Sequence, residues 1–202
     1  MKLLTILSFS ILILNTACKK SKLESINNVG SIDSLSYQPA VSGSTWKYDN
    51  YLSGVKSPGK TTICQNFDTS FNSKIYDVYL NNDGSYNYSR KEVDKYYYVL
   101  STSTNKTELC ALDVAKNINE TWIGGINGSD TYKYTIKEKL STLVVNGITL
   151  KNVIKVYNER YENGILKDDG YIWYAQGIGN FKTELKINTI PLEIILTAAD
   201  IK

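Results

Sequence analysis

The chain has 202 residues, with 23 lysines and arginines against 20 aspartates and glutamates, and its charges are scattered rather than gathered in blocks. A net charge of +3 without a basic block does not indicate nucleic-acid binding. The sequence has no histidine, so the commonest general base and the commonest zinc ligand are both missing. Composition therefore argues against metal-dependent and hydrolytic enzymes, and we expect a non-enzymatic protein without a cofactor.

The N-terminus has the pattern of an export signal. Lys2 precedes an uncharged, mostly apolar run, Leu3 to Leu14, which is too short for a permanent membrane span, and Asn15-Thr16-Ala17-Cys18 follows. This pattern resembles the lipobox-type signal of bacterial lipoproteins. The resemblance implies that residues 1–17 are a cleaved signal peptide and that Cys18 carries the lipid that anchors the protein to a membrane. The alternative is an ordinary secretory signal in which Cys18 is incidental.

The same resemblance implies a place in the cell envelope. Lys19 stands directly after Cys18, where many inner-membrane lipoproteins carry a retaining aspartate, so an outer-membrane destination is implied, facing either the periplasm or the surface. Residues 18–44 hold seven serines between Ser21 and Ser44 and show little periodicity, which predicts a lipidated flexible tether. The alternative is that Ile32 to Tyr37 packs on the domain as an edge segment.

From residue 45 to 202 the apolar residues recur with period two, which predicts one antiparallel β domain. The clearest run is Tyr132 to Leu140, where apolar and lysine-rich faces alternate. Asn82-Asp83-Gly84, Asn146-Gly147 and Asn163-Gly164 predict hairpin turns between neighbouring strands. We therefore expect an all-β fold of about 9–11 strands, a single antiparallel meander curled into a barrel or half-barrel, with a β-sandwich as the alternative.

Helix signals are scarce. A turn or two of helix is predicted between residues 113 and 119, and residues 191–200 could form either a helix or a final strand.

Two stretches resemble known β-proteins. Gly43-Ser44-Thr45-Trp46 resembles the glycine-x-tryptophan start of lipocalin barrels, which implies a lipocalin-like fold in which the indole closes one end. Residues 147–156 and 173–179 are similar to strand and turn segments of uncharacterised secreted bacterial β-proteins, which implies a fold and no chemistry.

The candidate binding residues are the three tryptophans, Trp46, Trp122 and Trp173. Such side chains either pack in the core or form an aromatic platform for sugar rings or another apolar ligand. Cys64 and Cys110 could form a disulfide in an exported protein, or remain two buried thiols. We assign no catalytic residue, because no histidine is present to activate a thiol and no spacing identifies a pair of acids.

One motif is misleading. Gly54 to Thr61 matches the phosphate-binding loop GxxxxGK[ST], but β-branched residues follow it where that loop needs a helix, so we expect a hairpin loop and no nucleotide. Asn82-Asp83-Gly84 and Asp168-Asp169-Gly170 offer too few oxygen ligands for calcium, so we expect turns and no metal site.

The leading hypothesis is a membrane-anchored, non-enzymatic envelope protein that binds a small apolar or sugar ligand in an aromatic-lined β-barrel. The alternative is a structural or protein-interaction module of the envelope.

Overall fold

The segments with alternating apolar and polar residues form β-strands. The computed structural model describes residues 25–27, 36–101 and 106–202, which form thirteen strands and no helix. The strands are β1 (Ser25–Asn27), β2 (Thr45–Leu52), β3 (Val55–Phe71), β4 (Lys74–Asn81), β5 (Tyr86–Glu92), β6 (Lys95–Ser101), β7 (Lys106–Asp113), β8 (Thr121–Asn127), β9 (Asp130–Val145), β10 (Ile148–Glu162), β11 (Ile165–Ala175), β12 (Gly179–Ile187) and β13 (Ile190–Asp200). The predicted signal peptide and Cys18 lie outside the described residues.

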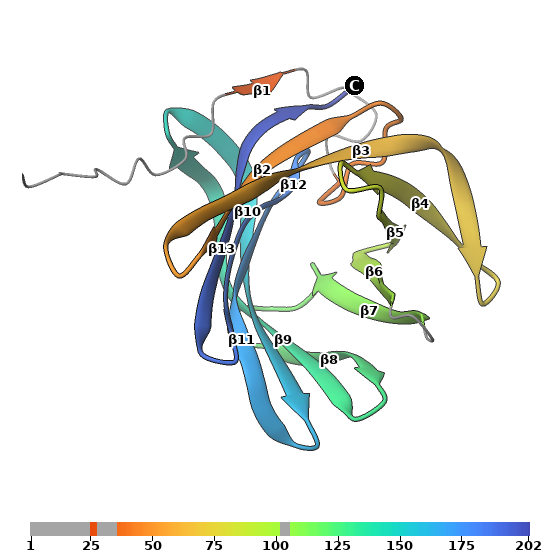
Figure 1. Ribbon diagram of the computed structural model, residues 1–202, viewed down its shortest axis with the longest axis vertical. Coiled ribbons are helices and arrows are strands. Elements are labelled where there is room, and N and C mark those ends of the chain that lie inside the picture. Colours follow the sequence, from red (N-terminus) through yellow and green to blue (C-terminus); the bar gives the residue numbers. More distant parts are fainter. Residues whose placement is uncertain (1–24, 28–35, 102–105) are drawn as a thin grey trace, which may run out of the picture.

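All strands belong to one sheet, in the order β7-β6-β5-β4-β3-β2-β13-β12-β11-β10-β9-β8. Every pair along this path is antiparallel, and the sheet curls until it is nearly closed into a barrel (Figure 1). The predicted all-β meander curled into a barrel is confirmed, and the sandwich alternative is wrong because a sandwich needs two sheets. Lipocalin barrels have eight strands, so the lipocalin-like pattern at Trp46 does not extend to the strand number.

The described meander has twelve strands, more than the nine to eleven expected. Strand β8 was not among the expected strands, because Gly124 and Gly125 lower the strand propensity of its centre. Residues 114–119 form turns rather than the helix expected there, and residues 190–200 form the final strand β13.

The predicted hairpin turns are confirmed. Asn146-Gly147 joins β9 to β10 and Asn163-Gly164 joins β10 to β11, with φ values of 52° and 84° and of 50° and 79°. Positive φ at both central residues matches the right-handed twist of the flanking strands, and asparagine and glycine accept it most readily. Asn82-Asp83-Gly84 lies in the turn between β4 and β5.

The segment that matches a phosphate-binding loop is a strand. Residues 55–61 begin β3 and pair with β2, so most of the hairpin loop expected here is also strand. A Cβ atom at Gly59 would lie 2.6 Å from the Tyr48 carbonyl oxygen, so this glycine serves close strand packing. A phosphate-binding loop needs backbone amides and a helix N-terminus that point to one phosphate, and an extended hairpin does not provide them.

Part of the predicted tether belongs to the domain. Ser36 and Tyr37 are buried, the Tyr37 ring packs edge-on against Tyr96 at 5.8 Å, and the Gly43 amide donates to the Cys64 carbonyl at 2.9 Å. The short strand β1 pairs in parallel with β13. The domain therefore starts before residue 45, because burying an aromatic ring outweighs the cost of ordering a few residues.

Two clusters of buried side chains fill much of the interior. One includes Trp46, Tyr79, Phe181 and Leu196, and the other includes Tyr96, Leu112, Tyr134 and Ile172.

Cys64 and Cys110 are buried on β3 and β7 and are not joined in a disulfide. Three strands separate β3 from β7 in the sheet, whereas a disulfide needs Cα atoms about 4.4–6.8 Å apart. The two cysteines are therefore two buried thiols, which was the alternative to pairing.

Side chains hold the seam of the barrel, where the terminal strands β7 and β8 meet. The Trp122 Nε1–H donates to the Cys110 carbonyl at 2.8 Å, and the Thr107 hydroxyl donates to Asn127 Oδ1 at 3.0 Å. The close approach of β8 to β7 depends on Gly124, because a Cβ atom there would lie 2.7 Å from the Cys110 carbonyl oxygen and 2.3 Å from the Tyr134 ring.

We expect Gly124→Ala to lower the free energy of unfolding by about 2–3 kcal/mol, because backbone and ring must both move to admit the methyl group. Gly128→Ala is the matched control in the adjoining turn: its Cβ would meet nothing within 4 Å, so only its φ of +61° opposes the change, at about 1 kcal/mol. Urea denaturation of both variants measures the difference. Equal losses would show that the seam is not tightly packed.

Candidate functional site

Strand pairing brings one row of side chains to the interior face from three neighbouring strands. Ile172 pairs with Thr183, and Thr183 pairs with Ile194. Because alternate residues of a strand point to opposite faces, paired residues share a face, and this row looks across the barrel.

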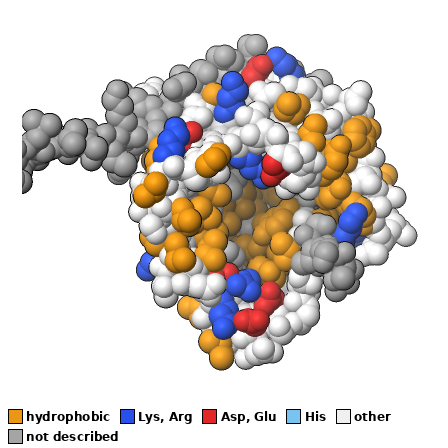
Figure 2. All heavy atoms as spheres, viewed as in Figure 1, with side chains coloured by type: hydrophobic (Ala, Val, Ile, Leu, Met, Phe, Trp, Pro, Cys, Tyr) orange, Lys and Arg blue, Asp and Glu red, His pale blue; other side chains and the backbone are white. Residues whose placement is uncertain are grey.

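The row borders an interior cavity of about 370 Å³, which is lined by residues of β11–β13 and of β2–β6. Figure 2 shows a hollow in this face of the molecule with mostly hydrophobic side chains along its walls. Six aromatic residues line the cavity: Trp46, Tyr48, Tyr79, Tyr88, Tyr98 and Tyr174. Its size and apolar lining are typical of small-molecule sites.

Three tyrosines of the cavity, Tyr48, Tyr79 and Tyr174, are neutral at physiological pH. Burial raises the pKa of Tyr48, Tyr79 and Tyr174 far above the ordinary value of a phenol. The Tyr48 hydroxyl donates to the Asn180 carbonyl at 3.0 Å, and the Tyr79 hydroxyl donates to the Pro39 carbonyl at 3.1 Å. The phenols of Tyr48 and Tyr79 therefore supply apolar surface to a ligand while their hydroxyl protons are already bonded.

Lys60 is the one charged side chain among the eighteen residues that line the cavity. It lies on β3 opposite Tyr48 of β2, so the two side chains share a face. Burial lowers the pKa of Lys60, and the nearby carboxylate of Asp83 opposes that shift. A partly buried ammonium group therefore stands in a largely apolar cavity.

Ser89 supplies a polar atom deep in the same wall. It is 6% exposed, and its hydroxyl lies near the Tyr79 phenol but makes no well-formed hydrogen bond to the described part of the chain. A buried hydroxyl without a partner costs about 1–3 kcal/mol, so a bound ligand or solvent molecule would stabilise it.

The structure does not bring the three predicted tryptophans together. Trp46 lies in the cavity wall, where its Nε1–H donates to the Ile178 carbonyl at 2.8 Å. Trp122 stacks on Tyr134, with 5.6 Å between ring centroids, and closes the seam. Trp173 borders a separate cavity of about 210 Å³ beside Phe181. The three tryptophans therefore have separate surroundings, and of the three only Trp46 lines the larger interior cavity.

Sequence reasoning missed Lys60 and the tyrosines of the cavity. Alternation in Trp46-Lys47-Tyr48 was a signal that Tyr48 shares the face of Trp46. Lys60 gave no such signal, because a bulge between β2 and β3 shifts the register just before it.

A larger groove, of about 520 Å³, follows the opposite face of the sheet. Its central row runs across five strands through Tyr157, Tyr171, Glu184, Glu193 and Tyr51, each paired with the next.

The chain already contacts the charged and aromatic groups of this groove. The Lys155 ammonium lies 4.6 Å from the Tyr171 ring centroid, and Lys182 forms ion pairs with both Glu184 and Glu193. Contacts within the chain therefore satisfy this row, and the interior cavity is the better candidate site.

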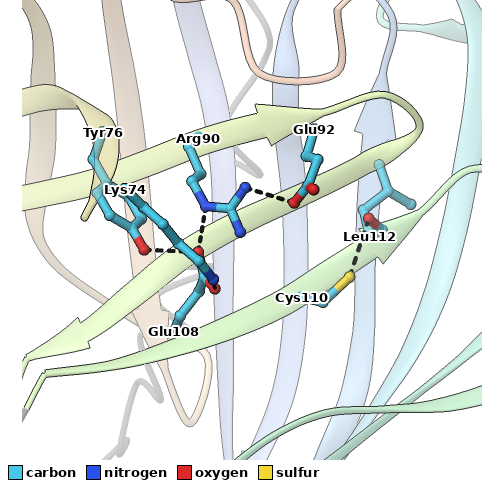
Figure 3. A network of polar contacts seen from close by, with 7 residues as sticks. All are labelled: Lys74, Tyr76, Arg90, Glu92, Glu108, Cys110 and Leu112. Atoms are coloured by element: carbon cyan, nitrogen blue, oxygen red, sulfur yellow. Dashed lines mark hydrogen bonds and ion pairs between the residues drawn. The ribbon is translucent and has the colours of Figure 1, made fainter. Parts of the chain in front are cut away.

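A polar network on β4–β7 lies outside the cavity. Figure 3 shows Lys74, Tyr76 and Arg90 converging on Glu108. The Glu108 carboxylate accepts from Lys74 Nζ at 2.5 Å, from the Tyr76 hydroxyl at 2.7 Å and from Arg90 Nε. With three donors on one carboxylate, this network is complete and has a structural role.

The surroundings of Cys110 do not activate its thiol. Burial raises the pKa of the Cys110 thiol to about 11, so the sulfur stays protonated. Across the described ranges, no group of three or more cysteines and acids is placed to hold a metal ion, and no helix is long and apolar enough to cross a membrane.

The fold and the cavity together define a class, the antiparallel β-barrel with a ligand-sized interior. Two solved structures are similar to this chain. One is of a putative lipoprotein from Parabacteroides distasonis (14% identity, 81% of this chain and 97% of that chain covered, TM-score 0.46), and the other is of a putative exported protein with a YmcC-like fold from Bacteroides fragilis NCTC 9343 (12% identity, 80% and 97% covered, TM-score 0.44). No family model and no curated protein matches the sequence.

We expect Glu108 to make the free energy of unfolding depend on pH in the acid range. Burial alone would raise its pKa, but the hydrogen bonds from Arg90, Lys74 and Tyr76 lower the pKa from 4.5 to about 2. Because the folded pKa is the lower one, the ionised carboxylate stabilises the fold above pH 4.5, and roughly 2 kcal/mol is lost as the pH falls towards 2.

Glu108→Gln should therefore be less stable at pH 7 and should lose less stability than the parent between pH 4.5 and 2. Urea denaturation across this pH range measures it. Glu162→Gln is the control, because that carboxylate, beside Lys167, is 45% exposed. Parallel pH curves for the parent and Glu108→Gln would contradict the expectation.

Proposed function

We propose that this protein is a non-enzymatic, lipid-anchored protein of the bacterial cell envelope that binds a small ligand with an apolar body inside its barrel. The observation that carries the proposal is the cavity of about 370 Å³ lined by six aromatic residues. A barrel interior packed solid would have favoured the structural or protein-interaction alternative instead. The N-terminal pattern that ends at Cys18 supports export and anchoring, and Lys19 directly after it supports an outer-membrane destination.

The residues of the cavity support binding rather than catalysis. Lys60 is the one charged residue among them, and they include no acid, no thiol and no histidine. No pair of side chains there can therefore exchange a proton with a substrate near neutral pH. Aromatic rings and aliphatic side chains at Ile172, Ile178 and Ile194 offer dispersion contacts to an apolar ligand instead.

The first test is titration of the purified full chain with the neutral fluorescent probe N-phenyl-1-naphthylamine. We expect saturable binding with a Kd of about 10 μM or tighter. Ile194→Trp places a larger ring in the cavity and should weaken binding at least about tenfold, because the probe and the indole compete for one volume.

Ile190→Trp is the matched control, because it introduces the same ring on the same strand at a side chain that is 47% exposed. Circular dichroism checks that both variants fold. Absence of binding by the parent, or equal binding by all three proteins, would reject the interior site and favour an interaction module.

The anchor has a separate test. We expect Cys18→Ser to abolish incorporation of labelled palmitate in a bacterial host and to move the protein from the detergent phase to the aqueous phase of a Triton X-114 extraction, because the thiol that takes the diacylglycerol is gone. Cys64→Ser is the control, since that thiol is buried in the domain. Unchanged labelling of Cys18→Ser would indicate an ordinary secretory signal.

A further inference from the structure

We propose that the cavity is selective for an apolar molecule that carries one carboxylate, such as a single-chain fatty acid, and that Lys60 is the counter-charge. This inference rests on the proposed function, since it names the ligand class of the same cavity. Four observations lead to it: the charge of the lining, the ion-pair state of Lys60, the bonding of the other polar residues, and the extent of the apolar surface.

The cavity has a net positive lining. Lys60 is its one cation, and none of the eighteen lining residues is an acid. The buried phenols stay neutral because their pKa values are raised. In surroundings of low dielectric, one positive charge that only Asp83, outside the lining, partly offsets favours a ligand with one negative charge over a neutral or cationic ligand.

Lys60 is available for such a ligand. Lys56, Lys74, Lys155 and Lys182 each pair with a carboxylate within 4 Å, whereas Lys60 takes part in none of the ion pairs of the described residues. Asp83 is the carboxylate that acts on Lys60 from nearby, but its Oδ1 already accepts from the Ser85 amide at 2.9 Å and from the Ser85 hydroxyl at 2.6 Å. A ligand carboxylate would offset the desolvation penalty of the Lys60 ammonium.

The other polar side chains of the cavity mostly bond to the protein. Thr62 donates to Asn81 Oδ1 at 2.8 Å, the Asn87 amide donates to the same oxygen at 3.3 Å, and the Asn180 amide donates to the Thr183 hydroxyl at 2.9 Å.

Besides the tyrosines, the remaining polar side chains of the lining are Lys60, the buried Ser89 and Gln38, whose amide lies near the Tyr79 hydroxyl, and Lys60 carries the one charge among them. A sugar presents many hydroxyl groups that each need a partner, so this lining favours a ligand with one polar head and an apolar body over a sugar.

The apolar part of the wall is large enough for such a body. Five aromatic residues, Trp46, Tyr48, Tyr79, Tyr98 and Tyr174, and three isoleucines, Ile172, Ile178 and Ile194, supply most of the apolar lining of the 370 Å³. Each methylene group moved from water into this volume contributes about 0.8 kcal/mol, so a chain of eight to ten carbons supplies most of the affinity and the head supplies selectivity.

The experiment compares decanoate with methyl decanoate, which has the same chain and no charge. Each is titrated against N-phenyl-1-naphthylamine bound to the purified full chain at pH 7. We expect decanoate to displace the probe at a concentration roughly tenfold lower than the ester does, as one charge-assisted hydrogen bond implies.

Lys60→Met keeps the length of the side chain and removes its charge, so it should abolish the preference for decanoate while the ester still displaces the probe. Lys60→Arg should retain the preference, because it keeps the charge. Lys47→Met is the matched control: that lysine is exposed on the adjacent strand β2 and should leave both ligands unaffected.

Each outcome decides between the proposals. If decanoate and its ester displace the probe equally from the parent, the carboxylate preference is wrong while the binding cavity stands, and this comparison does not depend on any variant folding. If the preference persists in Lys60→Met, Lys60 is not the counter-charge. If the probe itself does not bind, the proposed function fails first, and the inference fails with it.

Discussion

Closure of the sheet is the constraint on which the rest of this structure depends. Backbone pairing joins twelve strands side by side, with β2 next to β13, and leaves β7 and β8 as two edges. The edges meet through Trp122, which donates to the Cys110 carbonyl, and through two glycines that let the strands approach. An edge is a liability in any open sheet, and an unclosed sheet would expose the interior row of apolar side chains to water.

Closure also separates two kinds of chemistry. Residues on the outer row pair with one another, as Lys182 does with Glu184 and Glu193, and remain close to water. Residues on the inner row are aromatic, aliphatic or internally bonded, so Lys60 stands out there although it would be unremarkable on the surface. The candidate site is therefore a property of the curvature: the same lysine on a flat sheet would have no cavity to face.

Several features followed from the sequence because they depend on local physics. Period-two alternation identified the strands, and asparagine-glycine pairs identified two hairpin turns, since few residues accept positive φ. The same patterns failed at β8, where two glycines serve packing across the seam rather than strand propensity. They failed again at residues 55–61, where a strand continues through a glycine and a proline. Contacts across the seam overrode local preference at β8, and pairing with the adjacent strand β2 overrode it at residues 55–61.

The sequence by itself determined the fold class, the order of most strands and their turns, and the misfit of the phosphate-loop pattern, because nearest-neighbour pairing and backbone sterics are encoded within short segments. Only the tertiary structure decided that Trp46, Trp122 and Trp173 have three separate surroundings, that Cys64 and Cys110 do not pair, and that Lys60 faces a cavity. These facts depend on how far the sheet curls and where bulges shift its register. Both result from contacts between residues far apart in the chain.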